Sequence, residues 1–252
     1  MLEIRRVRKQ FGGFTAVDDV DVTVEVGTIH ALIGPNGAGK TTVFNLVTGV
    51  LPPTSGRIAF RGTDVTGWRP DRITGLGVAR TFQNIRLFRE MTAVENAMVA
   101  RHCRTRGGFL RALARLPWRE PVSERETRRR AEELLEVVGL SGRRDALAED
   151  LSLVEQRRLE LARALAVEPA LLLLDEPAAG MTPPEIRELN RLIRKIRETG
   201  VTVLLTEHHM SLVMEVSDVV TVLSYGRKIA EGPPAAVRRH PRVLEAYLGP
   251  GA

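Results

Sequence analysis

The chain has 252 residues, 43% of them apolar, enough to bury one large core or two lobes. No apolar run approaches the roughly 18 residues of a membrane-spanning helix, and residues 1–4 do not begin a signal peptide's apolar stretch, so neither is expected. The one cysteine, Cys103, excludes an intramolecular disulfide framework and fits a reducing compartment. The net charge of +6 fits an arginine-rich solvated exterior; with 4% aromatic residues, we expect no nucleic-acid partner.

Short apolar segments on both sides of residues 29–48 predict strands. Residues 2–7 form the first, and residues 20–26 alternate apolar and polar side chains as a half-buried strand does. Residues 57–60 predict a further strand after a turn rich in proline and glycine. Together they predict an N-terminal antiparallel β-subdomain.

Residues 29–48 join an apolar run, a glycine-rich loop and a helical pattern. The loop at 34–42, Gly-Pro-Asn-Gly-Ala-Gly-Lys-Thr-Thr, fits G-x-x-x-x-G-K-[ST]. Its glycines let backbone N–H groups turn toward phosphate oxygens, and the helix N-terminus adds partial positive charge. The complete, correctly flanked motif favours a nucleoside-triphosphate site over an accidental turn. The predicted nucleotide-binding residues are Gly34, Asn36, Gly37, Gly39, Lys40, Thr41 and Thr42.

Within that loop two side chains have predicted roles of their own. Lys40 is expected to reach the β- and γ-phosphates, and the Thr41 hydroxyl is expected to ligate Mg²⁺. His30, inside the apolar run before the loop, is predicted to be a buried histidine with a hydrogen-bond partner rather than a catalytic group.

From residue 92 to about 165 the pattern changes to mostly helical. A strand at 78–82 leads to Gln83, and Thr92 with Glu95 forms a capping box that opens the first helix. Residues 101–122 are arginine-rich and predict an irregular insertion with one short amphipathic helix. We therefore expect a single domain over 1–252, in which a helical subdomain at 92–165 interrupts a nucleotide-binding core formed by 1–91 and 166–252.

Two acidic residues follow four leucines at 171–174. The apolar run predicts a fully buried strand of a parallel sheet, with Asp175 at its end placed to hold Mg²⁺. Glu176 is placed to polarise the attacking water as general base. Alone, this segment would read as an ordinary strand running into a loop; the phosphate loop gives it the functional interpretation. The next buried strand, 201–205, ends at Thr-Glu-His-His.

With these motifs the chain resembles the ATP-binding subunits of ABC transporters over essentially its whole length. The resemblance implies that Gln83 senses the γ-phosphate and Mg²⁺ and faces the membrane subunits, and that His208 contacts the γ-phosphate. It implies that Phe11 stacks on adenine, although Phe11 could instead staple its turn to the β-subdomain. His209 is interpreted as a plain surface histidine.

Four strings are typical of the branched-chain amino acid importer branch of that family. They are Arg-Thr-Phe-Gln at 80–83, Leu-Phe-Arg-Glu-Met-Thr at 87–92, Asp-Glu-Pro-Ala-Ala-Gly at 175–180 and Glu-Ala-Tyr-Leu-Gly at 245–249. They are more specific than the phosphate loop, which many unrelated nucleotide-binding proteins share.

One motif departs from the family pattern. The signature Leu-Ser-Gly-Gly-Gln stands here as Leu-Ser-Leu-Val-Glu at 151–155. Ser152 and Glu155 still predict a capping box, and the resemblance implies that Ser152 faces the ATP of a partner subunit. Glu155 adds negative charge near that triphosphate, and the branched Val154 removes the space that glycine leaves. Thr182 also stands where many relatives have Asp or Asn.

The sequence predicts an α/β fold: a P-loop ABC-type ATPase core with an N-terminal antiparallel β-subdomain and an inserted helical subdomain. The resemblance implies ATP hydrolysis with Mg²⁺ that drives import of an amino acid, expected to be branched-chain, through separate transmembrane permease subunits served by a solute-binding protein. It implies a peripheral place on the cytoplasmic face of the plasma (inner) membrane and a second ABC ATPase subunit, in a homodimer or a heterodimer. The altered signature at 151–155 favours the heterodimer. Two alternatives stay open: a nucleotide-gated subunit that hydrolyses little, and an ABC ATPase without a transporter.

Overall fold

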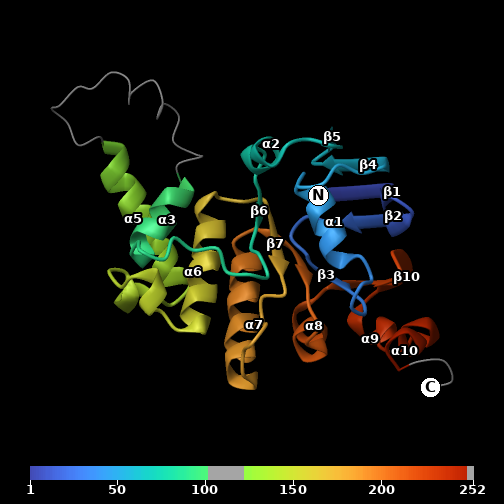
Figure 1. Ribbon diagram of the computed structural model, residues 1–252. Coiled ribbons are helices and arrows are strands. Elements are labelled where there is room, and N and C mark those ends of the chain that lie inside the picture. Colours follow the sequence, from blue (N-terminus) through green and yellow to red (C-terminus); the bar gives the residue numbers. More distant parts are fainter. Residues whose placement is uncertain (102–121, 249–252) are drawn as a thin grey trace. The chain divides into compact units, whose positions relative to one another are not determined.

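The computed structural model describes residues 1–101 and 122–248 (Figure 1). Cys103 and all but the two ends of the predicted insertion at 101–122 lie outside the described residues. The chain forms two compact units, Met1–Gln83 with Ala170–Ala252, and Asn84–Pro169. The bounds expected for a helical subdomain, 92 and 165, stay predictions beside these units.

The first unit contains an antiparallel sheet built from β1 (Leu2–Phe11), β2 (Phe14–Val24), β4 (Ser55–Phe60) and β5 (Thr63–Asp64), in the order β2-β1-β4-β5. The predicted antiparallel strands are confirmed, but β2 begins six residues before Val20. The pairing of β1 with β2 has register shifts after Ile4, Val7 and Lys9. These irregularities break the strict alternation that marks a strand in the sequence, so the first half of β2 was missed.

A second sheet in the same unit has the order β10-β9-β3-β8-β7-β6. All neighbours are parallel except the β9–β10 hairpin. Because β3, β7 and β8 are buried along their whole length, their sequences read as unbroken apolar runs. The strands are β3 (Ile29–Ile33), β6 (Val78–Arg80), β7 (Leu171–Asp175), β8 (Thr202–Thr206), β9 (Val219–Ser224) and β10 (Arg227–Gly232).

In this unit α1, α7 and α8 each follow a strand of the parallel sheet, namely β3, β7 and β8 (Figure 1). Residues 233–248 are predicted to be helical with a break at Pro241, and this is confirmed, since one helix ends at Val237 and the next begins at Pro241. The helices are α1 (Lys40–Val47), α2 (Pro70–Gly75), α7 (Pro183–Glu198), α8 (Met210–Val216), α9 (Pro234–Val237) and α10 (Pro241–Leu248).

The second unit is helical, with α3 (Ala93–Arg101), α5 (Val122–Val137) and α6 (Leu153–Ala166) in mutual contact. The predicted capping box is confirmed: the Glu95 carboxylate accepts from the Thr92 backbone N–H at 2.8 Å, and Thr92 Oγ1 accepts from Glu95 N–H at 3.3 Å. Two short 3₁₀ turns, Ser141–Arg143 and Ala148–Asp150, precede α6. In the part of the chain described, no helix has the length and apolarity to cross a membrane.

His30 is buried in β3, as predicted, with a hydrogen-bond partner. Its Nε2 lies 2.8 Å from Thr221 Oγ1, and the Thr221 hydroxyl donates to Glu231 at 2.8 Å. Since the hydroxyl proton is used by Glu231, Nε2 donates and the ring is neutral. Burial lowers the His30 pKa to about 4, against a smaller opposing effect of the Glu231 charge.

This lowered pKa makes the stability of the fold depend on pH. The unfolded chain binds a proton at His30 below pH 6.5 while the folded chain does not, so stability falls as pH drops from 6.5 toward 4. Between pH 7 and pH 5 we expect His30 to account for a loss of about 2 kcal/mol. Urea unfolding of the wild type and of His30→Gln across that range measures it. If the unfolding free energy of the wild type and of His30→Gln changed equally with pH, His30 would not be the source of the pH dependence.

Candidate active site

The glycine-rich loop between β3 and α1 folds around its own lysine. Lys40 Nζ donates to the carbonyl oxygens of Gly34 at 2.7 Å and Pro35 at 3.0 Å. Burial lowers the Lys40 pKa, while the charges of Glu176 and Asp175 raise it. The ammonium group is thus a cation held inside the loop, beside two carboxylates.

Two glycines allow this loop to pass close to its neighbours. Gly39 has φ 99°, and a Cβ there would lie 2.5 Å from the carbonyl oxygen of Ala16. A Cβ on Gly34 would lie 2.2 Å from the carbonyl oxygen of Leu223 on β9. Of the other predicted nucleotide contacts, Asn36, Gly37 and Thr41 are exposed and Thr42 is half-buried. The loop therefore presents its tip and its hydroxyl groups to solvent, where a ligand can reach them.

The carboxylate of Asp175 is buried and held on both oxygens. Parallel pairing places Asp175 opposite Thr206, whose hydroxyl donates to Oδ1 at 2.8 Å. Arg80 donates to Oδ2 at 2.7 Å, and its other terminal nitrogen donates to Asn45 on α1, also at 2.7 Å. Arg80 thereby ties the helix after the glycine loop to the end of β7. No role for Arg80 is predicted from the sequence. The pattern that could have indicated one is a charged residue at the end of a short apolar strand.

Glu176 brings the three predicted catalytic residues together. His208 Nε2 lies 2.7 Å from one carboxylate oxygen, and Gln83 Nε2 donates to the other at 2.7 Å. Glu176 has φ 49°, a left-handed conformation that costs a non-glycine residue about 1–2 kcal/mol. Its side chain is 15% exposed. The carboxylate is therefore fixed in direction while still open to solvent, which suits a proton acceptor.

Glu207 is a second buried carboxylate, and the sequence analysis assigned it no role. One oxygen accepts from Ala178 N–H at 2.8 Å, and the other accepts from the backbone N–H groups of His208 and His209 at 2.7 and 2.9 Å. His209 Nδ1 also lies 3.1 Å from Glu207. The interpretation of His209 as a plain surface histidine is thus wrong in one respect, because its ring is bound to Glu207. Glu207 joins the turn after Glu176 to the histidine segment.

Phe11 lies at the end of β1, where it pairs with Phe14 across the turn. Its side chain is half exposed, and Lys9 Nζ lies 5.0 Å from the ring centroid. An exposed ring at the tip of a hairpin is available for stacking; its contact with adenine stays a prediction.

Ser152 lies in the second unit, where it caps α6. The predicted capping box is confirmed, with Ser152 N–H donating to the Glu155 carboxylate at 2.8 Å. This bond is the main cause of a lowered Glu155 pKa. Arg143 Nε lies 3.1 Å from the other Glu155 oxygen. The charge of Glu155 is therefore partly balanced inside its own unit.

A glycine loop around a buried lysine, with two acidic residues at the end of the parallel β7, defines a nucleotide-binding protein of the phosphate-loop class. Comparison with known proteins agrees. The ABC transporter family model matches residues 17–179, and a model described as "Branched-chain amino acid ATP-binding cassette transporter" matches residues 227–249. The chain belongs to the ABC transporter family, and its predicted class, an ABC-type ATPase with an α/β fold, is confirmed.

Two similar curated proteins match along nearly their whole length. The "High-affinity branched-chain amino acid transport ATP-binding protein BraF" of Pseudomonas aeruginosa is 47% identical over 99% of this chain and 98% of that protein. The corresponding protein LivG of Escherichia coli is 43% identical with the same coverage. Among solved structures, the ADP conformation of MJ1267, an ATP-binding cassette of an ABC transporter, matches 99% of this chain and 98% of that one at a TM-score of 0.86 and 32% identity.

The contacts of Glu207 lead us to expect an effect of this residue on ATP hydrolysis. In Glu207→Gln the one remaining carbonyl oxygen cannot satisfy four donors, so the His208 segment shifts. We expect kcat for ATP hydrolysis to fall about tenfold or more, whereas ATP affinity changes less than threefold because the phosphate loop is untouched. Steady-state ATPase assays and nucleotide titration measure the two quantities.

The matched control is Glu215→Gln on α8, where the carboxylate is half exposed and bonded to Asn190. That variant should keep its kcat. If Glu207→Gln lowered the unfolding temperature but left kcat unchanged, Glu207 would be a stability residue only.

Proposed function

We propose that the chain binds and hydrolyses ATP to drive import of branched-chain amino acids through separate permease subunits. The hydrolytic part is carried by one observation, the Glu176 carboxylate held between Gln83 and His208 beside Asp175. The assignment of branched-chain amino acids as the solute is supported by the near full-length similarity to BraF and LivG and by the C-terminal match at residues 227–249.

The nucleotide would lie with its β- and γ-phosphates over the loop at 34–42. Lys40 would then exchange its bonds to Gly34 and Pro35 for phosphate oxygens, which are stronger acceptors because they are charged. The Thr41 hydroxyl and the Asp175 carboxylate are oxygen donors of the kind that Mg²⁺ prefers, so these residues fit that ion. When bound, Mg²⁺ would neutralise charge on the phosphate oxygens.

Hydrolysis would proceed by in-line attack of water on the γ-phosphorus. Glu176 would accept a proton from that water on a lone pair that its bonds to Gln83 and His208 leave free, since a carboxylate has about four acceptor positions. His208 Nε2 would then turn from Glu176 and donate to the γ-phosphate, which gains negative charge. Gln83 is bonded to the other carboxylate oxygen of Glu176, so it would sense the same proton transfer.

Replacing the proposed base tests this mechanism. Glu176→Gln keeps the side-chain volume but removes the proton acceptor, so we expect kcat to fall by roughly a hundredfold or more while ATP affinity stays within threefold. Glu198→Gln, the same change at an exposed end of α7, is the matched control and should behave as wild type. A Glu176→Gln enzyme with near wild-type turnover would remove Glu176 from the mechanism.

The importer assignment predicts where the chain is found in cells. With no membrane-spanning helix in its described part, the chain would reach the cytoplasmic face of the plasma membrane by binding the permease. Cell fractionation should therefore recover it with membranes when the permease genes are present and in the supernatant when they are deleted. Recovery in the supernatant in both strains would favour an ABC ATPase without a transporter.

The altered segment at 151–155 supports a second subunit of a different kind. In the family arrangement this segment closes over the ATP held by the partner, so the defect falls on the partner's site. The Glu155 carboxylate, which accepts from the Ser152 N–H, places a negative charge in the segment that would face the partner's triphosphate. We infer a heterodimer in which this chain's own Lys40, Asp175 and Glu176 work against an intact signature of the partner.

Restoring the family signature tests this inference. Leu153→Gly, Val154→Gly and Glu155→Gln together should raise the ATPase rate of the chain alone at least several-fold. One or two restored hydrogen bonds to charged phosphate, at ~1.5–3 kcal/mol each, correspond to roughly ten- to a hundredfold or more in rate.

Glu155→Gln alone separates charge from shape, since it removes the carboxylate and leaves Leu153 and Val154 in place. If the unmodified chain already hydrolyses ATP at a rate that the triple change does not alter, the segment is a tolerated variant. If neither the chain alone nor its complex with native partners turns over, the nucleotide-gated alternative is correct.

A further inference from the structure

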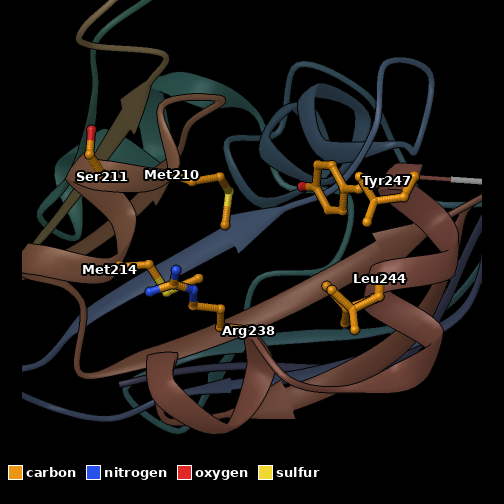
Figure 2. Close-up of a pocket in the computed structure, with 8 residues that line it drawn as sticks. Met210, Ser211, Met214, Arg238, Leu244 and Tyr247 are labelled. Carbon is orange, nitrogen blue, oxygen red and sulfur yellow. The ribbon is translucent and has the colours of Figure 1, made fainter. Parts of the chain in front are cut away.

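A largely apolar groove lies between α8 and the C-terminal helices of the first unit. It encloses about 420 Å³, and its apolar walls come from Met210 and Met214 on α8 and from Val243, Leu244 and Tyr247 on α10. Figure 2 shows the two methionines facing Tyr247 and Leu244 across this space. A volume of this size is in the range of small-molecule sites.

Among the described residues that line the groove one is a cation, and it is exposed. Arg238 follows α9, and its guanidinium group extends toward Met214 (Figure 2). Within the described part of the chain, Arg238 has no carboxylate partner and no hydrogen-bonded side chain. Two helices that line the groove carry acidic side chains, Glu215 of α8 and Glu245 of α10, but neither is among the lining residues. Glu215 is bonded to Asn190 and paired with Arg194. An apolar cavity with a single unpaired cation is complementary to an amphiphilic anion.

We propose that this groove binds a medium-chain aliphatic carboxylate, with the carboxylate on Arg238 and the alkyl chain between α8 and α10. A free amino acid fits less well, because none of the described residues that line the groove is acidic and could receive its ammonium group. A second copy of this chain also fits less well. Arg239 and Arg242 are exposed beside the lining residues, so two copies meeting face to face would oppose like charges.

The groove contacts both segments that carry the proposed nucleotide site. Met210 begins α8 directly after His208 and His209. The backbone N–H of Gly34, the first residue of the phosphate loop, acts on the Tyr247 hydroxyl: burial raises the pKa of this hydroxyl, and the Gly34 N–H opposes that rise. A ligand between Met210 and Tyr247 therefore restrains the positions of both, so its binding is linked to that of ATP. The linkage rests on the proposed function; binding in the groove does not.

Calorimetric titration of the full chain with decanoate, without nucleotide, tests the binding. Arg238→Met should weaken decanoate at least tenfold and leave uncharged decanol unchanged, whereas Arg238→Lys should retain decanoate affinity within about threefold. Arg239→Met, the same change on the neighbouring exposed residue, is the matched control and should bind as wild type. Leu244→Asp, on an exposed position of α10, should abolish binding of both compounds.

Saturable 1:1 decanoate binding with this pattern supports the site. Three results would overturn the site. Arg238→Met could leave decanoate binding unchanged, decanoate binding could fail to saturate, or a folded wild-type chain could fail to bind decanoate. Sedimentation tests the other possible occupant, a second copy of this chain. A dimer that Leu244→Asp dissociates would assign the groove to that second copy.

A separate measurement tests the linkage. Saturating decanoate should change ATP affinity at least threefold in the wild type, and by reciprocity ATP should change decanoate affinity by the same factor. Tyr247→Phe, which removes the hydroxyl on which the Gly34 N–H acts, should reduce that factor while decanoate still binds. Unchanged ATP affinity with intact decanoate binding would overturn the linkage alone, and failure of ATP to bind at all would count against the proposed function instead.

Discussion

The parallel pairing of β3, β8 and β7 is the constraint on which the site depends. Because carboxyl ends of parallel strands meet at one edge of a sheet, residues more than 130 positions apart in the chain converge there. β3 delivers the phosphate loop, β7 delivers Asp175 and Glu176, and β8 delivers Thr206 with the histidine segment. The register is equally important, since Asp175 lies opposite Thr206 and accepts a hydrogen bond from the hydroxyl of that residue. A slip by one residue would turn the carboxylate to the other face of the sheet.

Around that edge, buried charges are balanced by neighbours from different elements. Asp175 has Arg80 and Thr206, and Glu207 has three backbone N–H groups. Removing one partner of such a group leaves an uncompensated buried charge, which typically costs several kcal/mol. Lys40 differs, because its partners are neutral carbonyl groups. It is the cation with most to gain from a phosphate, so the loop is organised for an anion before any ligand arrives.

Much of this site could be predicted from the sequence because its motifs lie at the ends of regular elements. The phosphate loop, Asp175 and Glu176 follow apolar runs, and their local patterns are sufficient to place them. Gln83 and His208 were assigned by resemblance, and the structure brings both onto Glu176. Glu207 could not be assigned in that way, since its importance comes from four donors in two separate segments. The groove beside α8 was equally hidden, because it depends on how α8, Arg238 after α9, and α10 are placed around one space.

The altered signature can be separated physically from the stability of its helix. Ser152 caps α6 with the help of Glu155, but glutamine at the same position completes a capping box equally well. Arg143 forms an ion pair with Glu155, and the Arg143 side chain is nearly half exposed. Exposed ion pairs contribute at most about 1 kcal/mol to the free energy of unfolding. Leu153 is also largely exposed. The fold therefore does not require leucine, valine and glutamate at 153–155, and the effect of these residues is to be sought in what the segment presents to a partner's nucleotide.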